Sequence, residues 1–280
     1  IADGTLLESR SKILGLKLKF LELYKLEDAQ KNKIGVVQFI KITDCQDTRP
    51  GKLNIKNAKY VIKNLDFGIS EANKNKKIAL VTGPIQKSNI INGGFKNFQG
   101  HTEWIKKKTK SKNVVMLLSS KKISVALATT HIPLAEVAKN IQKSKLIKLI
   151  QILHLGLQKK LKIKNPSITV LGLNPHAGEN GKIGAEEIKK INPAIKVCKE
   201  MGINASYAIS ADTAFNVKKL KQTDAYLAMY HDQALPVLKA LSFGEAVNIT
   251  LGAPIVRTSV DHGTAIDIAG KMKPNLGSIK

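Results

Sequence analysis

The sequence has few cysteines and no long apolar run, and each shortage excludes a class of protein. Its 280 residues include only two cysteines, Cys45 and Cys198. Two cysteines are too few for a disulfide scaffold and are typical of a reducing compartment, so we expect a cytoplasmic protein. No apolar run approaches the length of about 18 residues that a transmembrane helix needs. No signal peptide is visible either, so we expect no membrane partner.

Acidic residues, arginines and aromatic residues are also scarce. The chain has 21 Asp and Glu against 46 Lys and Arg, a formal net charge of +25, which would suit a nucleic-acid-binding protein. Only three of those 46 residues are arginines (Arg10, Arg49 and Arg257), and aromatic residues make up 5% of the chain. Base recognition relies on arginine and on aromatic stacking. We therefore interpret the lysines as ordinary surface residues and keep a basic nucleic-acid-binding protein as a remote alternative.

Short β-branched apolar runs alternate with longer amphipathic segments, a pattern that favours an α/β fold. Strands are predicted at 34–37, 78–82, 114–118, 124–129, 168–173, 226–230 and 247–251. Helices are predicted at 57–73, 133–154 and 184–201. Several of the runs are apolar throughout, which is typical of parallel strands buried on both faces. The length suggests two domains or one large α/β unit with two lobes.

Three of the six histidines follow three predicted strands. These residues are His131, His176 and His231. Ligands of open α/β sheets bind at the carboxyl ends of the strands. Imidazole is a good ligand for zinc and related metals, and a three-histidine set leaves coordination positions open for a substrate. The pattern predicts a shared catalytic metal site, although for any one histidine alone a simple loop residue is the better interpretation.

The sequences beside these histidines fit such a site. His176 lies in a Gly-rich turn, 174–181, whose backbone N–H groups could approach an anion. Asp232 follows His231 and could either orient its ring or cap the next helix. His101 and Thr102 are ambiguous, because Thr102 could simply cap a helix.

Two cations also stand out. Arg257 follows the apolar pair Ile255-Val256, and a buried arginine needs a carboxylate or phosphate partner. Lys239 could add a second positive charge, although a solvated helix lysine is the simpler interpretation. Together the two residues favour binding of an anionic ligand.

Several long motifs in a fixed order resemble the 4-hydroxythreonine-4-phosphate dehydrogenase family of pyridoxal 5′-phosphate (vitamin B6) biosynthesis. The motifs cover 125–134, 172–179, 228–233 and 247–270, and 81–84 and 100–103 agree with them. The resemblance implies a two-lobed α/β/α fold similar to the isocitrate and isopropylmalate dehydrogenases, with a mostly parallel sheet and the active site in the cleft between the lobes. It further implies that residues 1–280 form one catalytic unit, with the family's N-terminal strand and C-terminal helix outside this sequence.

The resemblance also implies an activity. Enzymes of this family use NAD(P) and a divalent metal (zinc, magnesium or cobalt) to oxidise 4-phosphooxy-L-threonine. The product is a β-keto acid that decarboxylates to 3-amino-2-oxopropyl phosphate. The implied partners are a phosphorylated small molecule and a second copy of the chain, with sites near the homodimer interface. Two alternatives stay open: a dehydrogenase of the same family acting on another phosphorylated hydroxy acid, and a three-histidine metallohydrolase.

The resemblance assigns roles to individual residues. The implied metal ligands are His131, His176 and His231. The implied substrate contacts are His101, Thr102, Lys239, Asn248 and Arg257. The implied cofactor segment contributes His262, Gly263, Thr264, Ala265 and Asp267. Lys239 and Asp212 are both candidates for proton transfer, and the sequence does not choose between them.

Overall fold

A computed structural model describes residues 1–271 and 275–279. The chain divides into two compact units, each with its own internal packing. Unit 1 comprises Ile1–Thr109 and His262–Asn275, and unit 2 comprises Lys110–Asp261 and Leu276–Lys280. Among the described residues, no helix is both long enough and apolar enough to cross a membrane.

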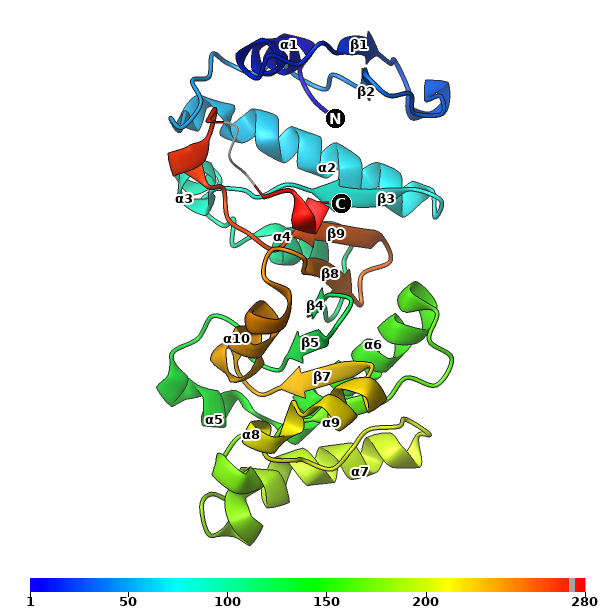
Figure 1. The fold of residues 1–280 in the computed structure, drawn as a ribbon, viewed down its shortest axis with the longest axis vertical. Coiled ribbons are helices and arrows are strands. Elements are labelled where there is room, and N and C mark those ends of the chain that lie inside the picture. The colour runs from blue at the N-terminus through cyan, green and yellow to red at the C-terminus, as the bar shows by residue number, and fades with distance from the viewer. Residues whose placement is uncertain (272–274, 280) are drawn as a thin grey trace. The chain divides into compact units, whose positions relative to one another are not determined.

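Unit 1 is mainly helical (Figure 1). Its helices are α1 (Gly4–Ile13), α2 (Ala58–Lys74), α3 (Lys87–Asn92) and α4 (His101–Lys108), and its strands are β1 (Lys19–Glu22), β2 (Val36–Phe39) and β3 (Ala79–Thr82). Helix α1 begins where the carboxylate of Asp3 accepts a hydrogen bond from the backbone N–H of Thr5 (2.9 Å), as an N-cap residue does. Helix α2 occupies the segment predicted at 57–73, and it buries its apolar face.

Unit 2 contains a mixed sheet. In spatial order its strands are β6 (Ile168–Val170), β7 (Ala225–Ala228), β5 (Ser124–Leu127), β4 (Val115–Ser119), β8 (Val247–Leu251) and β9 (Val256–Val260). The first three strands pair in parallel. The other three pairings, β5–β4, β4–β8 and β8–β9, are antiparallel. Strands β6, β7, β5 and β8 therefore run in one direction, with β4 and β9 opposed to them.

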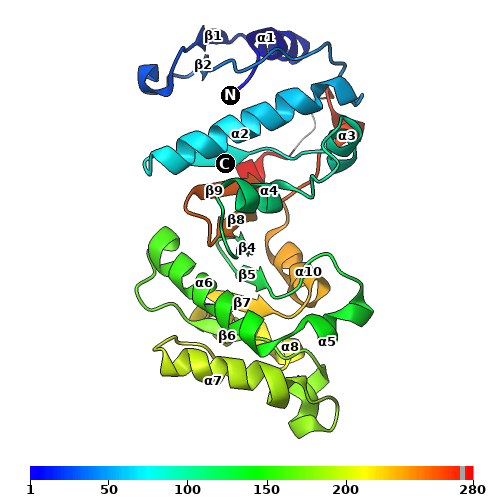
Figure 2. The same cartoon turned by 180° about the vertical axis from the view of Figure 1, so that it is seen from behind.

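Helices cover both faces of this sheet (Figures 1 and 2). Helices α6 (Lys143–Leu161) and α7 (Asn192–Glu200) pack on one face with Leu227 of β7. Helices α8 (Ala211–Ala214) and α10 (His231–Ser242) pack on the other face with Tyr226. Neighbouring residues of β7 thus point into opposite cores, which explains why its sequence is apolar throughout. The predicted α/β class is confirmed.

Two helix predictions need correction. The segment 133–154 does not form one helix, because Gln142 adopts an extended backbone (φ −130°, ψ 137°) that separates α5 (Val137–Asn140) from α6. Ile141, just before this break, is 1% exposed and belongs to the core, so the apolar stripe continues although the helix does not. The segment 184–201 begins with a π-helical turn, Glu187–Ile191, before α7. Strand β1 had no counterpart in the sequence prediction.

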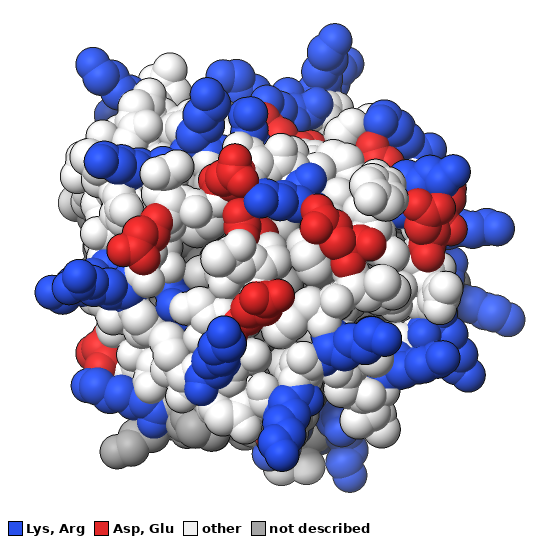
Figure 3. Space-filling model, turned by 90° about the horizontal axis from the view of Figure 1, so that it is seen from above, with Lys and Arg blue, Asp and Glu red and all other residues white. Residues whose placement is uncertain are grey.

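Charged residues of both signs share the surface. On the face in Figure 3, Lys and Arg side chains project all around, and Asp and Glu side chains lie among them. In unit 1, Lys41 pairs with Asp44 (N–O 2.8 Å) and Lys74 with Glu71 (2.7 Å). The lysines of this face therefore do not form a purely basic patch, which agrees with their interpretation as ordinary surface residues.

The burial of His154 on α6 predicts that the stability of the protein depends on pH. Burial lowers the pKa of His154, whose Nδ1 is buried with no hydrogen-bond partner among the described residues. Between this lowered pKa and the ordinary value of about 6.5, the unfolded chain binds more protons than the folded chain. Acidification through this range should therefore destabilise the protein, by at most about 1.4 kcal/mol per pH unit from this group.

Urea unfolding of the wild type and of His154→Gln at pH 7.5 and pH 5.5 tests this prediction. The variant should lose less unfolding free energy than the wild type on acidification. Identical losses in the two proteins would contradict it.

Candidate active site

The three predicted metal ligands follow three adjacent parallel strands. His131 comes after β5, His231 begins α10 directly after the turn that ends β7, and His176 comes after β6. Because these strands are neighbours and parallel, their carboxyl ends lie at one edge of the sheet. The rings of His131 and His231 lie 5.6 Å apart between centroids. The structure thus brings two of the three imidazoles side by side and puts the third beyond the neighbouring strand.

Asp232 orients one of these rings. His231 Nδ1 is 2.7 Å from Asp232 Oδ1, which holds the ring and leaves Nε2 for another ligand. Tyr230 is the N-cap residue of α10, and no side chain caps this helix. Of the two roles predicted for Asp232, the structure therefore favours orientation of the histidine.

The donor set fits a divalent metal in residue type and in placement along the sheet, since neutral imidazole is a common metal ligand. In residues 1–271 and 275–279, however, no three His, Cys, Asp or Glu side chains lie close enough together to hold a metal ion. The structure therefore offers a pair of neighbouring imidazoles with an oriented ring, and a third imidazole at the same edge of the sheet.

His176 lies on a turn with an unusual backbone. The residues from His176 to Gly181 all have positive φ angles, between 44° and 90°. Each left-handed residue other than glycine costs about 1–2 kcal/mol. Such a conformation persists only where the surroundings impose it, and it occurs preferentially at functional sites.

Glu187 supports this turn through hydrogen bonds to the residues that precede it. Its side chain is 2% exposed. Oε1 accepts hydrogen bonds from the backbone N–H groups of Leu173 (2.7 Å) and Asn174 (2.8 Å), and Oε2 accepts one from Asn174 Nδ2 (2.9 Å). A Cβ atom at Gly178 would lie 2.6 Å from Glu187 Oε2, so only glycine fits there. From the sequence, Glu187 would be taken for an ordinary acidic residue at a helix N-terminus. No neighbouring residue indicates that it supports the turn that carries His176.

Two predicted substrate contacts lie on the α10 face of the sheet. Asn248 is directly opposite Leu118, which packs in the same cluster as α10, and directly opposed residues of an antiparallel pair share a face. Asn248 Oδ1 is buried and has no hydrogen-bond partner within the described residues. Arg257 is 2% exposed, and its Nη1 donates to Thr250 Oγ1 (3.3 Å). A buried arginine suits an anionic group of a ligand, and an unsatisfied amide oxygen suits a hydrogen-bond donor of that ligand.

The turn between β8 and β9 is fixed by a lysine from α6. The ammonium group of Lys160 donates to the carbonyl oxygens of Thr250 (3.0 Å) and Ile255 (2.6 Å), and burial lowers its pKa. Since Arg257 follows Ile255 by two residues, this contact also fixes where Arg257 enters the sheet.

The two candidates for proton transfer differ in their surroundings. Lys239 forms an ion pair with Asp261, whose side chain is only 9% exposed, and also donates to the Asp261 carbonyl oxygen (3.2 Å). Asp212 is exposed, and a hydrogen bond from the Ser210 hydroxyl, assisted by the charge of His176, lowers its pKa. Asp212 therefore stays ionised at neutral pH. Asp261 was not predicted from the sequence, although it directly precedes the predicted cofactor segment.

The predicted cofactor residues belong to unit 1. The Thr264 hydroxyl donates to Gln86 Oε1 (3.1 Å), His262 Nδ1 lies 2.9 Å from the Gly263 carbonyl oxygen, and Ala265 has a positive φ of 44°. Asp267 lies in the 3₁₀ turn Ile266–Ile268. The segment is an irregular loop with local hydrogen bonds.

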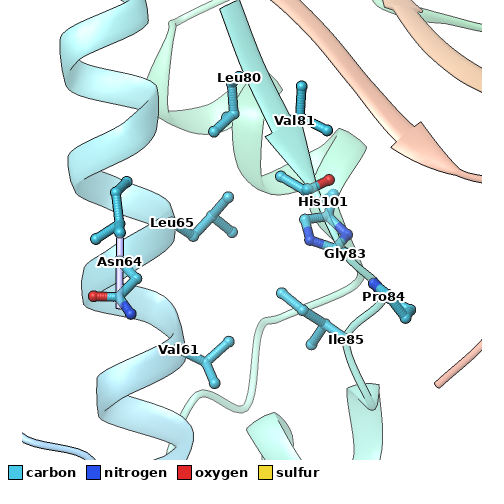
Figure 4. Close-up of a pocket in the computed structure, with 11 residues that line it drawn as sticks. Val61, Asn64, Leu65, Leu80, Val81, Gly83, Pro84, Ile85 and His101 are labelled. Atoms are coloured by element: carbon cyan, nitrogen blue, oxygen red, sulfur yellow. The ribbon is translucent and has the colours of Figure 1, made fainter. Parts of the chain in front are cut away.

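His101 and Thr102 are the first two residues of α4, and Gly100 is the N-cap residue. The interpretation of Thr102 as a helix cap is therefore wrong. His101 lines a cavity of about 250 Å³ in unit 1, together with Leu65 of α2 and Leu80 of β3 (Figure 4). The surroundings of this imidazole are mainly apolar, and His101 is the titratable side chain of the cavity wall.

The whole length of the chain matches a known family. A family model described as "Pyridoxal phosphate biosynthetic protein PdxA" matches residues 1–280. The chain belongs to this family. It is 44% identical over 280 residues to a 4-hydroxythreonine-4-phosphate dehydrogenase of Pseudoalteromonas translucida, covering all of this chain and 84% of the relative. It is 45% identical over 277 residues to the enzyme of that name from Shewanella frigidimarina, covering 99% and 84%.

A solved structure of the family agrees. The crystal structure of a 4-hydroxythreonine-4-phosphate dehydrogenase from Burkholderia phymatum matches with a TM-score of 0.86 at 33% identity, covering 99% of this chain and 84% of that one. The resemblance stated from the sequence motifs is confirmed, and so is the enzyme class, an oxidoreductase.

The role of Glu187 is testable through stability. Glu187→Gln replaces one acceptor by an NH₂ group that must face either the backbone N–H groups of Leu173 and Asn174 or the side-chain NH₂ group of Asn174. An unsatisfied buried donor costs about 1–3 kcal/mol, so the unfolding free energy should fall by about that amount. Glu186→Gln is the matched control, because Glu186 accepts a hydrogen bond from Asn174 Nδ2 (2.8 Å) and the side-chain oxygen of a glutamine can keep it. Equal losses in urea unfolding of the two variants would refute the proposed support of the turn.

Proposed function

We propose that this protein oxidises 4-phosphooxy-L-threonine with NAD(P), in pyridoxal 5′-phosphate biosynthesis. The product is a β-keto acid that loses CO₂ to give 3-amino-2-oxopropyl phosphate. The observation that carries the proposal is the placement of His131, His176 and His231 beyond three adjacent parallel strands, in a chain that matches the family along its whole length. A metallohydrolase would share the histidines, but the dehydrogenase relatives favour oxidation.

We assign His131, His176 and His231 as the ligands of a divalent metal: zinc, magnesium or cobalt. A bound divalent metal acts as a Lewis acid that polarises an oxygen atom of the substrate and lowers its pKa. The protein's part is to hold the imidazoles: Asp232 fixes the ring of His231, and Glu187 supports the turn that carries His176. These contacts fix the ring of His231 and the turn that carries His176 before any ligand binds.

Anionic groups of the substrate are assigned to Arg257 and Lys239. Arg257 presents a planar fork that matches a phosphate or carboxylate, and its burial strengthens the interaction. Asn248 Oδ1 is an acceptor for a hydroxyl or amino group of the substrate. His101 and Thr102 are assigned as substrate contacts on the family resemblance alone.

Lys239 is the better candidate for proton transfer. Asp212 is held as a carboxylate by the Ser210 hydroxyl, so it is a weak base near neutral pH and holds no proton to donate. The side chain of Lys239 carries N–H donors, and its ion pair with Asp261 holds it in place. An ammonium group at this place can donate to a carbanionic carbon as CO₂ departs, and it can then recover its proton from water.

The cofactor is assigned to the loop that carries His262, Gly263, Thr264, Ala265 and Asp267. This assignment follows the family resemblance, and the hydrogen bond between Thr264 and Gln86 supports a loop of fixed shape. We further propose a cytoplasmic homodimer with sites near the subunit interface. The two cysteines, Cys45 and Cys198, are both free, as expected in a reducing compartment.

Metal dependence gives the first test of this function. Purified protein should reduce NAD⁺ when given 4-phosphooxy-L-threonine, and a chelator should abolish the activity until Zn²⁺, Mg²⁺ or Co²⁺ is restored. His176→Ala should lose metal binding and activity while it keeps the wild-type circular dichroism spectrum. Activity that survives complete metal removal would refute the three-histidine site, and hydrolysis without NAD binding would favour the metallohydrolase.

Arg257 gives the second test. Arg257→Lys removes the planar fork and should lower kcat/KM by about 100-fold, mainly through KM, which corresponds to about 2.7 kcal/mol. Arg49→Lys is the matched control, since Arg49 is exposed, and it should leave the kinetics unchanged.

A panel of phosphorylated hydroxy acids, assayed with the wild type, separates the proposed substrate from another of the same class.

A further inference from the structure

One side chain joins the ends of the two strands that precede His231 and His176. Gln233 Oε1 accepts a hydrogen bond from the backbone N–H of Met229 (2.7 Å), directly after β7. Gln233 Nε2 donates to the carbonyl oxygen of Gly172 (2.5 Å), two residues after β6. The amide therefore spans the gap between neighbouring strands just where their backbone pairing stops.

The third strand end is attached to the same residue, Met229. The hydroxyl of Thr129, which follows β5, donates to the Met229 carbonyl oxygen (2.7 Å), and this hydroxyl is buried. The backbone N–H of Thr129 also donates to that oxygen (3.2 Å). Met229 is thus linked to β5 through its carbonyl oxygen and to β6 through Gln233. The three strand ends that lead into the histidines form one hydrogen-bonded unit.

The side-chain amide of Gln233 meets both chemical demands at this position. The bridge needs one acceptor and one donor on the same short planar group, because Met229 offers an N–H and Gly172 a carbonyl oxygen. Glutamate supplies the acceptor but would place a carboxylate oxygen against the Gly172 carbonyl. Methionine fills the volume but supplies neither hydrogen bond.

We propose that Gln233 is a positioning residue that sets the spacing of His176 from the His131–His231 pair, and through that spacing the affinity of the metal site. This inference rests on the proposed metal site and adds to it a residue that the function had not used. Three consecutive residues then have distinct tasks: His231 is a ligand, Asp232 orients its ring, and Gln233 fixes the neighbouring strand end.

The experiment measures metal affinity in the absence of substrate and cofactor. Wild type and Gln233→Glu are titrated with Co²⁺ by calorimetry, and the visible absorption of bound Co²⁺ reports its coordination geometry. Loss of a partner that orients metal ligands typically weakens binding 10–100-fold. We expect a Kd increase of about that size for Gln233→Glu, with a changed absorption spectrum. Gln233→Met should show the same increase.

Thr223→Val is the matched control. The hydroxyl groups of Thr223 and Thr169 lie 2.7 Å apart and join the same two strands, β6 and β7, at the amino end of β7, away from the histidines. This variant loses one inter-strand side-chain hydrogen bond, so thermal unfolding should show a comparable loss of stability. Its Co²⁺ affinity and spectrum should match the wild type.

The outcomes separate this inference from the proposed function. If the wild type binds Co²⁺ and Gln233→Glu and Gln233→Met bind it equally well, the inference is overturned and the metal site stands. If Thr223→Val weakens Co²⁺ binding as much as the Gln233 variants do, the effect is one of general stability and the inference is again overturned. Failure of both Gln233 variants to fold would also overturn the inference. If the wild type binds no Co²⁺, the metal site fails, and the inference with it.

Discussion

The parallel pairing of β5, β7 and β6 is the constraint on which the candidate active site depends. In a parallel pair, both carboxyl ends lie at the same edge of the sheet, so the residue after each strand is delivered to one place. If β7 ran in the opposite direction, His231 would lie at the far edge, away from His131 and His176. Helices α6 and α7 make this pairing possible, because a parallel connection must cross the sheet, and their apolar sides bury one of its faces.

The sequence predicts much of this arrangement, for a definite reason. A strand buried on both faces is apolar at every residue, so β7 is visible as a short apolar run. The segment 247–251, which also carries Asn248 and Thr250, is predicted with the bounds of β8. The break at Gln142 is not visible, since the apolar stripe runs through it into α6. The pairing of the strands cannot be predicted either, because an apolar run does not indicate which strand lies beside it. A largely parallel sheet was expected for this reason, whereas β4, β8 and β9 form antiparallel pairs.

The same limit applies within the site. The sequence alone predicts the three histidines, Asp232 and Arg257 as site residues, because metal ligands and a lone arginine among apolar residues are chemically conspicuous. It does not predict the residues that hold these side chains in place. Gln233 reaches Gly172 across 61 residues, and Lys239 reaches Asp261 across 22. Glu187 lies in a stretch with ordinary helix composition. Contacts of this kind come from tertiary structure, so no local pattern marks them.

The division between ligands and supports also follows from burial. His131 and His176 are exposed and His231 is half-exposed, whereas Thr129 and Glu187 are buried. A ligand must face solvent to exchange a metal or meet a substrate, whereas the hydrogen bonds of Thr129 and Glu187 are shielded from competition with water. Asp232, which is exposed beside His231, is the exception among the supports. The left-handed backbone of the turn at His176 is strained and would relax without the hydrogen bonds of Glu187. Replacing an exposed histidine therefore removes chemistry and leaves the fold, whereas replacing a buried support changes the geometry and the stability together.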